Sequence, residues 1–203
     1  MARQFSDQGK HGCSQFMLGW LHLPTYPAFI MKYLFYCFAL LCCLLTGCTG
    51  IPKGITAVEG FDAQRYLGTW YEIARLDHRF ERGLSNISAT YSMRQDGGLK
   101  VLNKGWNVAD SKWKEAEGKA YFVGSPSTGQ LKVSFFGPFY GGYTIFELDK
   151  KDYAYAMVTG PDKSYFWLLS RTKHLPPATL ARLLERAKQL GFATDDLIFV
   201  KQE

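Results

Sequence analysis

The chain has 203 residues, with 24 lysines and arginines against 18 aspartates and glutamates and a net charge of +6. Its composition, 47% hydrophobic and 21% charged, excludes a long disordered protein and suits one globular domain or two small ones. The aromatic share of 16%, together with 20 glycines, favours many short strands joined by tight turns over a bundle of helices.

An uncharged apolar run, Tyr33 to Leu45, follows Lys32 near the N-terminus. At about 13 residues the run is too short to span a bilayer comfortably as a helix. A basic residue before a short apolar run is typical of a secretory signal, and a plain membrane anchor is the alternative.

The cysteines are confined to the first 48 residues, so no disulfide can brace the rest of the chain; they are Cys13, Cys37, Cys42, Cys43 and Cys48. The last follows Leu45-Thr46-Gly47, and this order resembles the lipobox of bacterial lipoproteins. The resemblance implies cleavage after Gly47 and lipid attachment at Cys48. Because Met31 begins a complete signal by itself, residues 1–30 are predicted to be an upstream extension, with a functional tail as the alternative.

We therefore expect a signal peptide over residues 31–47, a lipidated Gly/Pro linker over 48–59 and one folded domain over 60–203. Turn-forming residues divide that domain at regular intervals. They predict eight strands, near 68–76, 84–93, 99–108, 113–123, 130–136, 142–148, 153–159 and 164–171. Short hairpins in chain order favour an all-β, up-and-down antiparallel barrel, which encloses side chains or one small ligand.

The period then changes from that of a strand to that of a helix. Pro176-Pro177 opens a segment whose leucines and alanine recur on one face, and Gly191 closes it. The pattern predicts one amphipathic helix packed outside the barrel, with a surface-active membrane helix as the weaker alternative. A last short strand is expected over 197–200.

A family resemblance rests on three stretches of this sequence. Residues 68–74, Gly-Thr-Trp-Tyr-Glu-Ile-Ala, resemble the first conserved region of lipocalins, and Leu168 to Arg171 resembles the third. Thr159-Gly160-Pro161-Asp162 resembles a variant of the middle region. The likeness covers residues 58–203 and is close to the outer-membrane lipocalins of the apolipoprotein D type. It implies an eight-stranded barrel, attachment to the cell outer membrane on its periplasmic side and upkeep of that membrane.

The same resemblance assigns structural roles to Gly68, Trp70 and Arg171. Glycine permits a close turn into the barrel, and the indole fills its closed end. In the family the matching arginine lies across that tryptophan as a cation–π pair.

Alternation along each strand predicts inward-facing, ligand-binding candidates that would form a largely aromatic cavity: Tyr91, Trp106, Tyr121, Phe136, Tyr143, Tyr155 and Trp167. Trp113 is expected to face water. Rings that simply fill a small barrel are the alternative. The segment 135–143 carries five aromatic residues around a turn. This predicts an apolar rim of the ligand site or a surface that binds a partner, with plain packing as the alternative.

Catalysis is not expected, and neither is a metal or another cofactor. After the signal only His78 and His174 remain, without metal-ligand spacing, and both are interpreted as lone surface-loop residues. Glu115 and Glu117 alternate beside lysines as on a solvated face. The basic residues form no block of the kind that nucleic-acid binding requires.

Two hypotheses of function remain. The first is a lipid-anchored carrier that binds, stores or transports a fatty acid, lysophospholipid or similar amphiphile in its barrel. The second is a filled barrel that docks a partner through its aromatic rim. The sequence leaves a homo-oligomer open.

Overall fold

The computed structural model describes residues 32–33 and 49–203. The chain divides into two compact units, Met1–Cys43 and Leu44–Glu203, and only Lys32 and Tyr33 of the first unit are described. The expected extension over 1–30, all of the signal peptide but those two residues, and Cys48 therefore lie outside the described residues. Within the described ranges, no helix combines the length and the apolar character needed to cross a bilayer.

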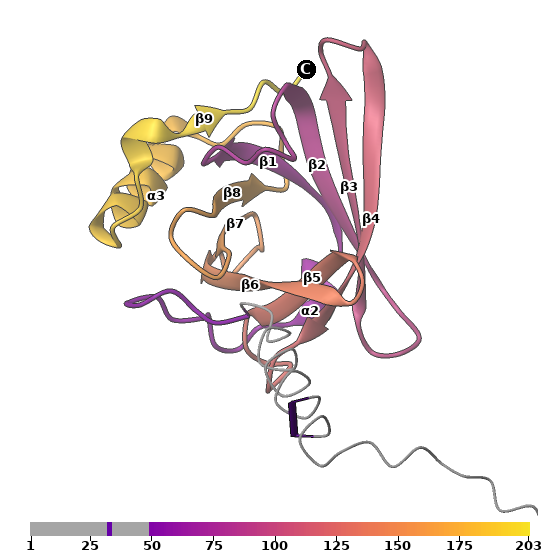
Figure 1. Cartoon of the computed structure of the whole chain (residues 1–203). Helices are drawn as coiled ribbons and strands as arrows, with labels where there is room; N and C mark the ends of the chain where they lie inside the picture. The colour runs from indigo at the N-terminus through magenta and orange to yellow at the C-terminus, as the bar shows by residue number, and fades with distance from the viewer. Residues whose placement is uncertain (1–31, 34–48) are drawn as a thin grey trace, which may run out of the picture. The chain divides into compact units, whose positions relative to one another are not determined.

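The second unit is an antiparallel barrel whose first eight strands follow one another in chain order (Figure 1). The first strand, β1, pairs with both β8 and β2, which closes the sheet and confirms the predicted fold class. The strands are β1 (Gly68–Arg75), β2 (Leu84–Met93), β3 (Leu99–Asn107), β4 (Lys112–Phe122), β5 (Gln130–Phe136), β6 (Phe139–Leu148), β7 (Tyr155–Thr159) and β8 (Phe166–Ser170).

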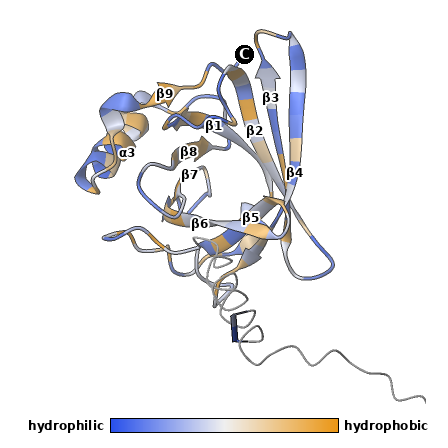
Figure 2. Cartoon of the chain, in the orientation of Figure 1, coloured by the Kyte–Doolittle hydropathy of each residue, from blue (hydrophilic) through white to orange (hydrophobic). Residues whose placement is uncertain are grey.

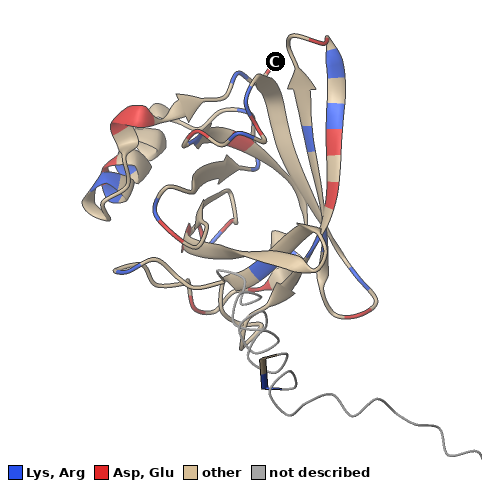
Figure 3. Ribbon diagram, viewed as in Figure 1, with Lys and Arg blue, Asp and Glu red and all other residues tan. Residues whose placement is uncertain are grey.

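Along each strand, successive side chains point alternately to the inner and the outer face of the barrel. Hydrophobic and hydrophilic residues interchange along β2, as Figure 2 shows. The outer face of β4 carries the expected solvated charges (Figure 3), where Glu115 pairs with Lys104 at 3.1 Å and Glu117 with Lys100 at 2.7 Å. Because the barrel runs up and down, its loops fall alternately at two ends.

One end of the barrel is closed by a short helix, α2 (Ala63–Tyr66), just before β1. Asp62 caps this helix, because its carboxylate accepts hydrogen bonds from the backbone N–H groups of Gln64 and Arg65 at 2.9 and 3.4 Å. The cap fixes where the chain turns inward, so the last helical residue, Tyr66, is fully buried.

The predicted C-terminal helix is α3 (Pro177–Gln189), and it packs outside the barrel. It ends as the sequence indicates: Gly191 has φ +82° and the N–H of Phe192 donates to the carbonyl of Ala187 at 3.1 Å. Phe192 then stacks on Phe146 of β6, with ring centroids 5.1 Å apart. A second apolar core therefore lies between α3 and the outer face of the sheet.

The segment expected to link lipid and fold packs against the barrel over most of its length. Pro52, Ile55 and Ala57 are buried. The backbone N–H of Val58 donates to the carbonyl of Ile145 in β6 at 2.9 Å. Its carbonyl accepts from the N–H of Gly129, just before β5, at 2.9 Å. Residues 51–58 thus belong to the folded unit rather than to a free spacer.

The seam between β1 and β2 is short, since these strands pair only from Gly68↔Tyr91 to Tyr71↔Ser88. Beyond it the chain end fills the gap, after the turn η1 (Thr194–Asp196) and the edge strand β9 (Ile198–Phe199) beside β1. The side-chain amide of Gln202 donates to the carbonyls of Glu72 and Ile87, both at 2.8 Å. One buried amide therefore joins the two strands where their own ladder stops.

Candidate functional site

Trp70 lies fully buried at the closed end, as the sequence analysis expects. The guanidinium of Arg171 lies over its ring at 3.9 Å from the centroid, so the expected cation–π contact is present. The same guanidinium donates to the carbonyls of Arg65 and Thr69 at 2.7 and 3.0 Å. Arg171 thereby ties α2 and β1 to the end of β8. Gly68, at φ +90°, makes the turn from α2 into β1.

Three tyrosines form a floor above Trp70. The hydroxyl of Tyr143 is 2.9 Å from that of Tyr66 and 2.7 Å from that of Tyr91, and the indole N–H of Trp70 donates to the backbone carbonyl of Tyr66 at 2.9 Å. Burial raises the pKa of all three phenols, that of Tyr91 to about 12. The floor is therefore a neutral layer of rings and paired hydroxyls.

Tyr66 was not among the residues expected from the sequence. It lies in the helix before β1, where strand alternation gives no information. The four-residue spacing between Tyr66 and Trp70 is the sequence signal that could have indicated it. In the structure the centroids of these two rings are 4.7 Å apart.

Above the floor, inward-facing apolar side chains are only partly buried, although they pack against the inner core. The set comprises Ala89, Val133, Phe135 and Trp167. Phe135 lies on Gly118, where an added Cβ would be 2.8 Å from the ring. A close-packed interior would bury all of these residues, so the accessible surface on the inner face makes the barrel interior the candidate ligand site.

Of the seven expected ligand residues, Tyr91, Tyr143 and Trp167 lie on the inner face. The inward direction of Trp106 and Tyr121 is wrong. The register of β3 puts Val101 inside and therefore Trp106 outside, where its ring is 5.6 Å from that of Trp113, which is itself half exposed as expected. On β4 the Tyr121 hydroxyl points away from the core and donates to Asp96 at 2.9 Å.

The inward direction of Tyr155 and Phe136 is wrong as well. Tyr155 faces α3, and its hydroxyl accepts a hydrogen bond from Arg182 at 2.7 Å. Phe136 is 82% exposed, because Val133 and Phe135 face the inner core and alternation turns Phe136 outward. Aromatic residues line both faces of this sheet, so an aromatic side chain does not by itself reveal the inner face.

A buried ionic cluster lies near the open end of the barrel, where β1 leads into the loop 76–83. Arg75 donates to the carboxylate of Glu72 at 3.0 Å and to the backbone carbonyl of Glu81 at 3.0 Å. The indole N–H of Trp167 donates to the carboxylate of Glu81 at 3.2 Å. Burial raises the pKa of both glutamates, and the charge of Glu81 raises that of Glu72 further.

This cluster is not apparent from the sequence, because charged residues are expected to point outward. Counting by twos from Trp70 would have placed Glu72 inside. Two carboxylates share one guanidinium here, so the cluster resists carrying both negative charges at once.

His78 lies in the same loop and is buried, which corrects its interpretation as a surface residue. Its ring stacks between Phe80 and Tyr165, with centroid distances of 5.4 and 4.9 Å. Burial, followed by the positive charge of Arg75, lowers its pKa. Its Nε2 atom has no hydrogen-bond partner among the described residues. His174 is exposed as expected.

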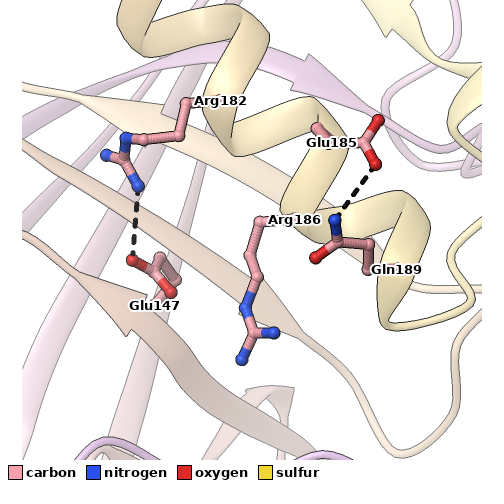
Figure 4. Close-up of a pocket in the computed structure, with 5 residues that line it drawn as sticks. All are labelled: Glu147, Arg182, Glu185, Arg186 and Gln189. Carbon is pink, nitrogen blue, oxygen red and sulfur yellow. Dashed lines mark hydrogen bonds and ion pairs between the residues drawn. The ribbon is translucent and has the colours of Figure 1, made fainter.

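A separate hollow of about 310 Å3 lies on the outside, beside α3 (Figure 4). Its lining is polar, with Arg182 3.8 Å from Glu147 and the side chain of Gln189 donating to Glu185 at 3.1 Å. Such a surface suits water and ions more than an acyl chain, so the barrel interior is the better candidate site.

Closed barrel, outer helix and capped floor together define a lipocalin. A sequence profile of the Lipocalin-like domain matches residues 61–202, and the chain belongs to this family. As a member, it is a binding protein and not an enzyme.

The relatives it resembles include bacterial lipoproteins. It is 53% identical over 167 residues to outer membrane lipoprotein Blc of Vibrio cholerae, covering 82% of this chain and 98% of that protein. Identity to outer membrane lipoprotein Blc of Escherichia coli K12 is 55%, covering 74% and 85% of the two chains. Apolipoprotein D of Rattus norvegicus is 36% identical over 62% of this chain and 68% of its own.

Among solved structures, insecticyanin of Manduca sexta aligns with a TM-score of 0.60 over 76% of this chain and 87% of its own. At 22% identity, this likeness supports the fold alone.

Proposed function

We propose that this chain is a lipid-anchored lipocalin that binds, stores or transports a fatty acid, lysophospholipid or similar amphiphile in its barrel and so supports maintenance of the outer membrane. The observation that carries the proposal is the partly accessible apolar wall between the tyrosine floor and the ionic cluster. An acyl chain fits the wall, and a polar head fits the end that offers charged and hydrogen-bonding groups.

The anchor is part of the same proposal. It places residues 1–30 upstream of the working protein, removes 31–47 as a signal peptide, and attaches lipid to Cys48 at the start of the segment 48–59. The names of the bacterial relatives support an outer-membrane lipoprotein, and a periplasmic orientation is proposed with it. The lipocalin domain spans 60–203, with residues 51–58 packed on its flank.

A second candidate is a partner-docking protein, and a specific observation favours it. Phe136 and Phe139 project from the β5–β6 turn, 82% and 69% exposed. Exposed aromatic pairs of this kind occur in interfaces. Ligand titration separates the two candidates, because a protein that acts only through its rim needs no ligand in the barrel.

The test is a titration of delipidated residues 49–203 with fatty acids and lysophospholipids of increasing chain length. Both apolar cores lie within residues 51–197, so this part of the chain contains its own core. We expect saturable one-site binding that tightens with each pair of methylenes until the cavity is full, since apolar burial contributes about 25 cal/mol per Å2. No saturable response at any length would remove the carrier function.

Two tryptophans provide a matched pair for locating the ligand. Trp167 faces inward and Trp113 outward. We expect the emission change on binding to be lost in Trp167→Phe and kept in Trp113→Phe. Equal effects of the two substitutions would place the ligand outside the barrel.

The anchor is tested in cells by changing Cys48→Ser. We expect an uncleaved or soluble protein, because at about 0.8 kcal/mol per buried methylene the acyl chains supply the membrane affinity. Mass spectrometry and membrane fractionation provide the measurement. Unchanged mass and attachment would contradict the anchor.

A further inference from the structure

Bulky apolar side chains project from the open end of the barrel on three different loops. Phe80 extends from the loop between β1 and β2, and Val108 from that between β3 and β4; they are 61% and 60% exposed. Phe136 and Phe139 flank the turn between β5 and β6 and are more exposed still. In an up-and-down barrel these three connections lie at the same end, so the four side chains surround one mouth.

The closed end differs in its chemistry. Its connections are polar turns, 94–98, 123–129 and 149–154, and the first of them holds an ion pair, Arg94 with Asp96 at 2.7 Å. Met93, at the end of β2, is the large hydrophobic side chain exposed there among the described residues, at 42%. Exposed apolar side chains on loops are therefore concentrated at the open end, while Trp113, Ile198 and Phe199 are exposed on strands β4 and β9.

The charged groups around the mouth that remain outside local ion pairs are mainly basic. Asp77 pairs with Arg82 at 2.6 Å, and Asp110 pairs with Lys114 at 3.4 Å. Arg79 and Lys112 are exposed beside Phe80 and Val108 and form no ion pair with a described residue. In the remaining loop Asp162 and Lys163 are neighbours and offset one another.

This combination fits a lipid surface. Separate apolar tips can each enter the boundary between headgroups and acyl chains, whereas a protein partner needs one continuous complementary surface. Unpaired basic groups beside the tips are attracted by anionic headgroups. A guest with an acyl chain would also come from such a surface.

We propose that the open mouth of the barrel docks on an anionic phospholipid bilayer through Phe80, Val108, Phe136 and Phe139, assisted by Arg79 and Lys112. This inference deepens the proposed function, on which it rests for the nature of the guest, by naming the surface that the mouth contacts. A second copy of the chain is the competing occupant of the same tips.

The experiment is flotation of residues 49–203, which lack Cys48 and hence the anchor, with vesicles of phosphatidylethanolamine and phosphatidylglycerol. We expect binding that weakens in high salt and on phosphatidylcholine vesicles. The double variant Phe136→Ser/Phe139→Ser should lower the partition coefficient by about tenfold. The matched control is Met93→Ser at the closed end, which should bind as the parent does.

A second double variant, Phe80→Ser/Val108→Ser, tests the other two loops and remains informative if the first fails to fold. Arg79→Gln/Lys112→Gln should remove most of the preference for phosphatidylglycerol. Absence of vesicle binding by the parent domain, or parent-like binding by both apolar variants, would overturn the proposal. So would a concentration-dependent dimer that the variants abolish while vesicles stay unbound, because it assigns the tips to a second copy.

The amphiphile titration, repeated on the rim variants without vesicles, keeps this inference apart from the carrier function. We expect parent-like affinity, since the exposed tips do not line the inner wall. Vesicle binding without amphiphile binding would retain the docking surface and remove the carrier. Amphiphile binding without vesicle binding would do the opposite.

Discussion

The two ends of this barrel are built from different chemistry. At the closed end the indole of Trp70 lies 3.9 Å from the guanidinium of Arg171 and 4.7 Å from the ring of Tyr66, and each of these polar groups has a partner. At the open end a histidine and an arginine leave ring or guanidinium nitrogens without hydrogen bonds among the described residues, while phenylalanines face solvent. The difference indicates that the interactions that stabilise the fold are concentrated at the closed end, whereas groups at the open end remain available for binding.

The largest expected effect is at the closed end. Trp70→Ala removes a fully buried ring and should cost about 3–5 kcal/mol of unfolding free energy, as truncation of large core aromatics does. Phe136→Ala, at the open end, should stay within about 0.5 kcal/mol of the parent. Urea unfolding of both variants provides the measurement. Similar losses would break the comparison.

The next effect concerns the arginine that ties the closed end together. Arg171→Ala removes the cation–π contact and the hydrogen bonds to three backbone carbonyls, those of Arg65, Thr69 and Tyr153, so we expect a loss of about 1–3 kcal/mol. The matched control is Arg182→Ala on α3, whose side chain is 53% exposed, lies 3.8 Å from Glu147 and donates to the Tyr155 hydroxyl at 2.7 Å. Its loss should stay below about 1 kcal/mol. An equal loss in the control would mean that Arg171 acts only as another surface charge.

The smallest effect is a pH dependence confined to the open end. Unfolded His78 takes up a proton near pH 6.5, but the folded form resists it, so stability should fall as the pH drops below about 6.5. Arg75 opposes protonation of this ring, while Asp77 and Asp162 favour it. His78→Phe keeps the stacking and should flatten the acid side of the profile.

The glutamates of the ionic cluster give stability the opposite dependence on pH. Their raised pKa means that the folded state holds more protons, so stability should fall as the pH rises above about 4.5. Glu72→Gln should reduce this slope. Urea midpoints between about pH 5 and 8 for the parent and both variants decide the matter. Three parallel profiles would show that the open end contributes nothing to the titration.

The sequence was sufficient for the fold because its signals are local. Turn residues mark each hairpin, and the 3.6-residue period with Gly191 marks α3 and its end. Trp70 and Arg171 could be assigned through a family motif. These features do not depend on how distant strands align.

The inner face could not be predicted from the same signals. On β5 the inner face is taken by Val133 and Phe135, so Phe136 points outward, and a second core under α3 gives Tyr155 an apolar environment on the outer face. Glu72 and Arg75 compensate each other only through the fold, so neither suggests burial when considered alone. Facing directions require the register, which is a property of strand pairs.

The short seam between β1 and β2 has a kinetic consequence. Hairpins such as β2–β3 join neighbours in the chain, but the amide of Gln202 bonds to carbonyls 130 and 115 residues away. Loop closure over such separations is slow, so local hairpins should form first and the seam last. The seam would then also be the first place to open in the native state, and hydrogen exchange should be faster at β9 and its partners than in the middle of β3.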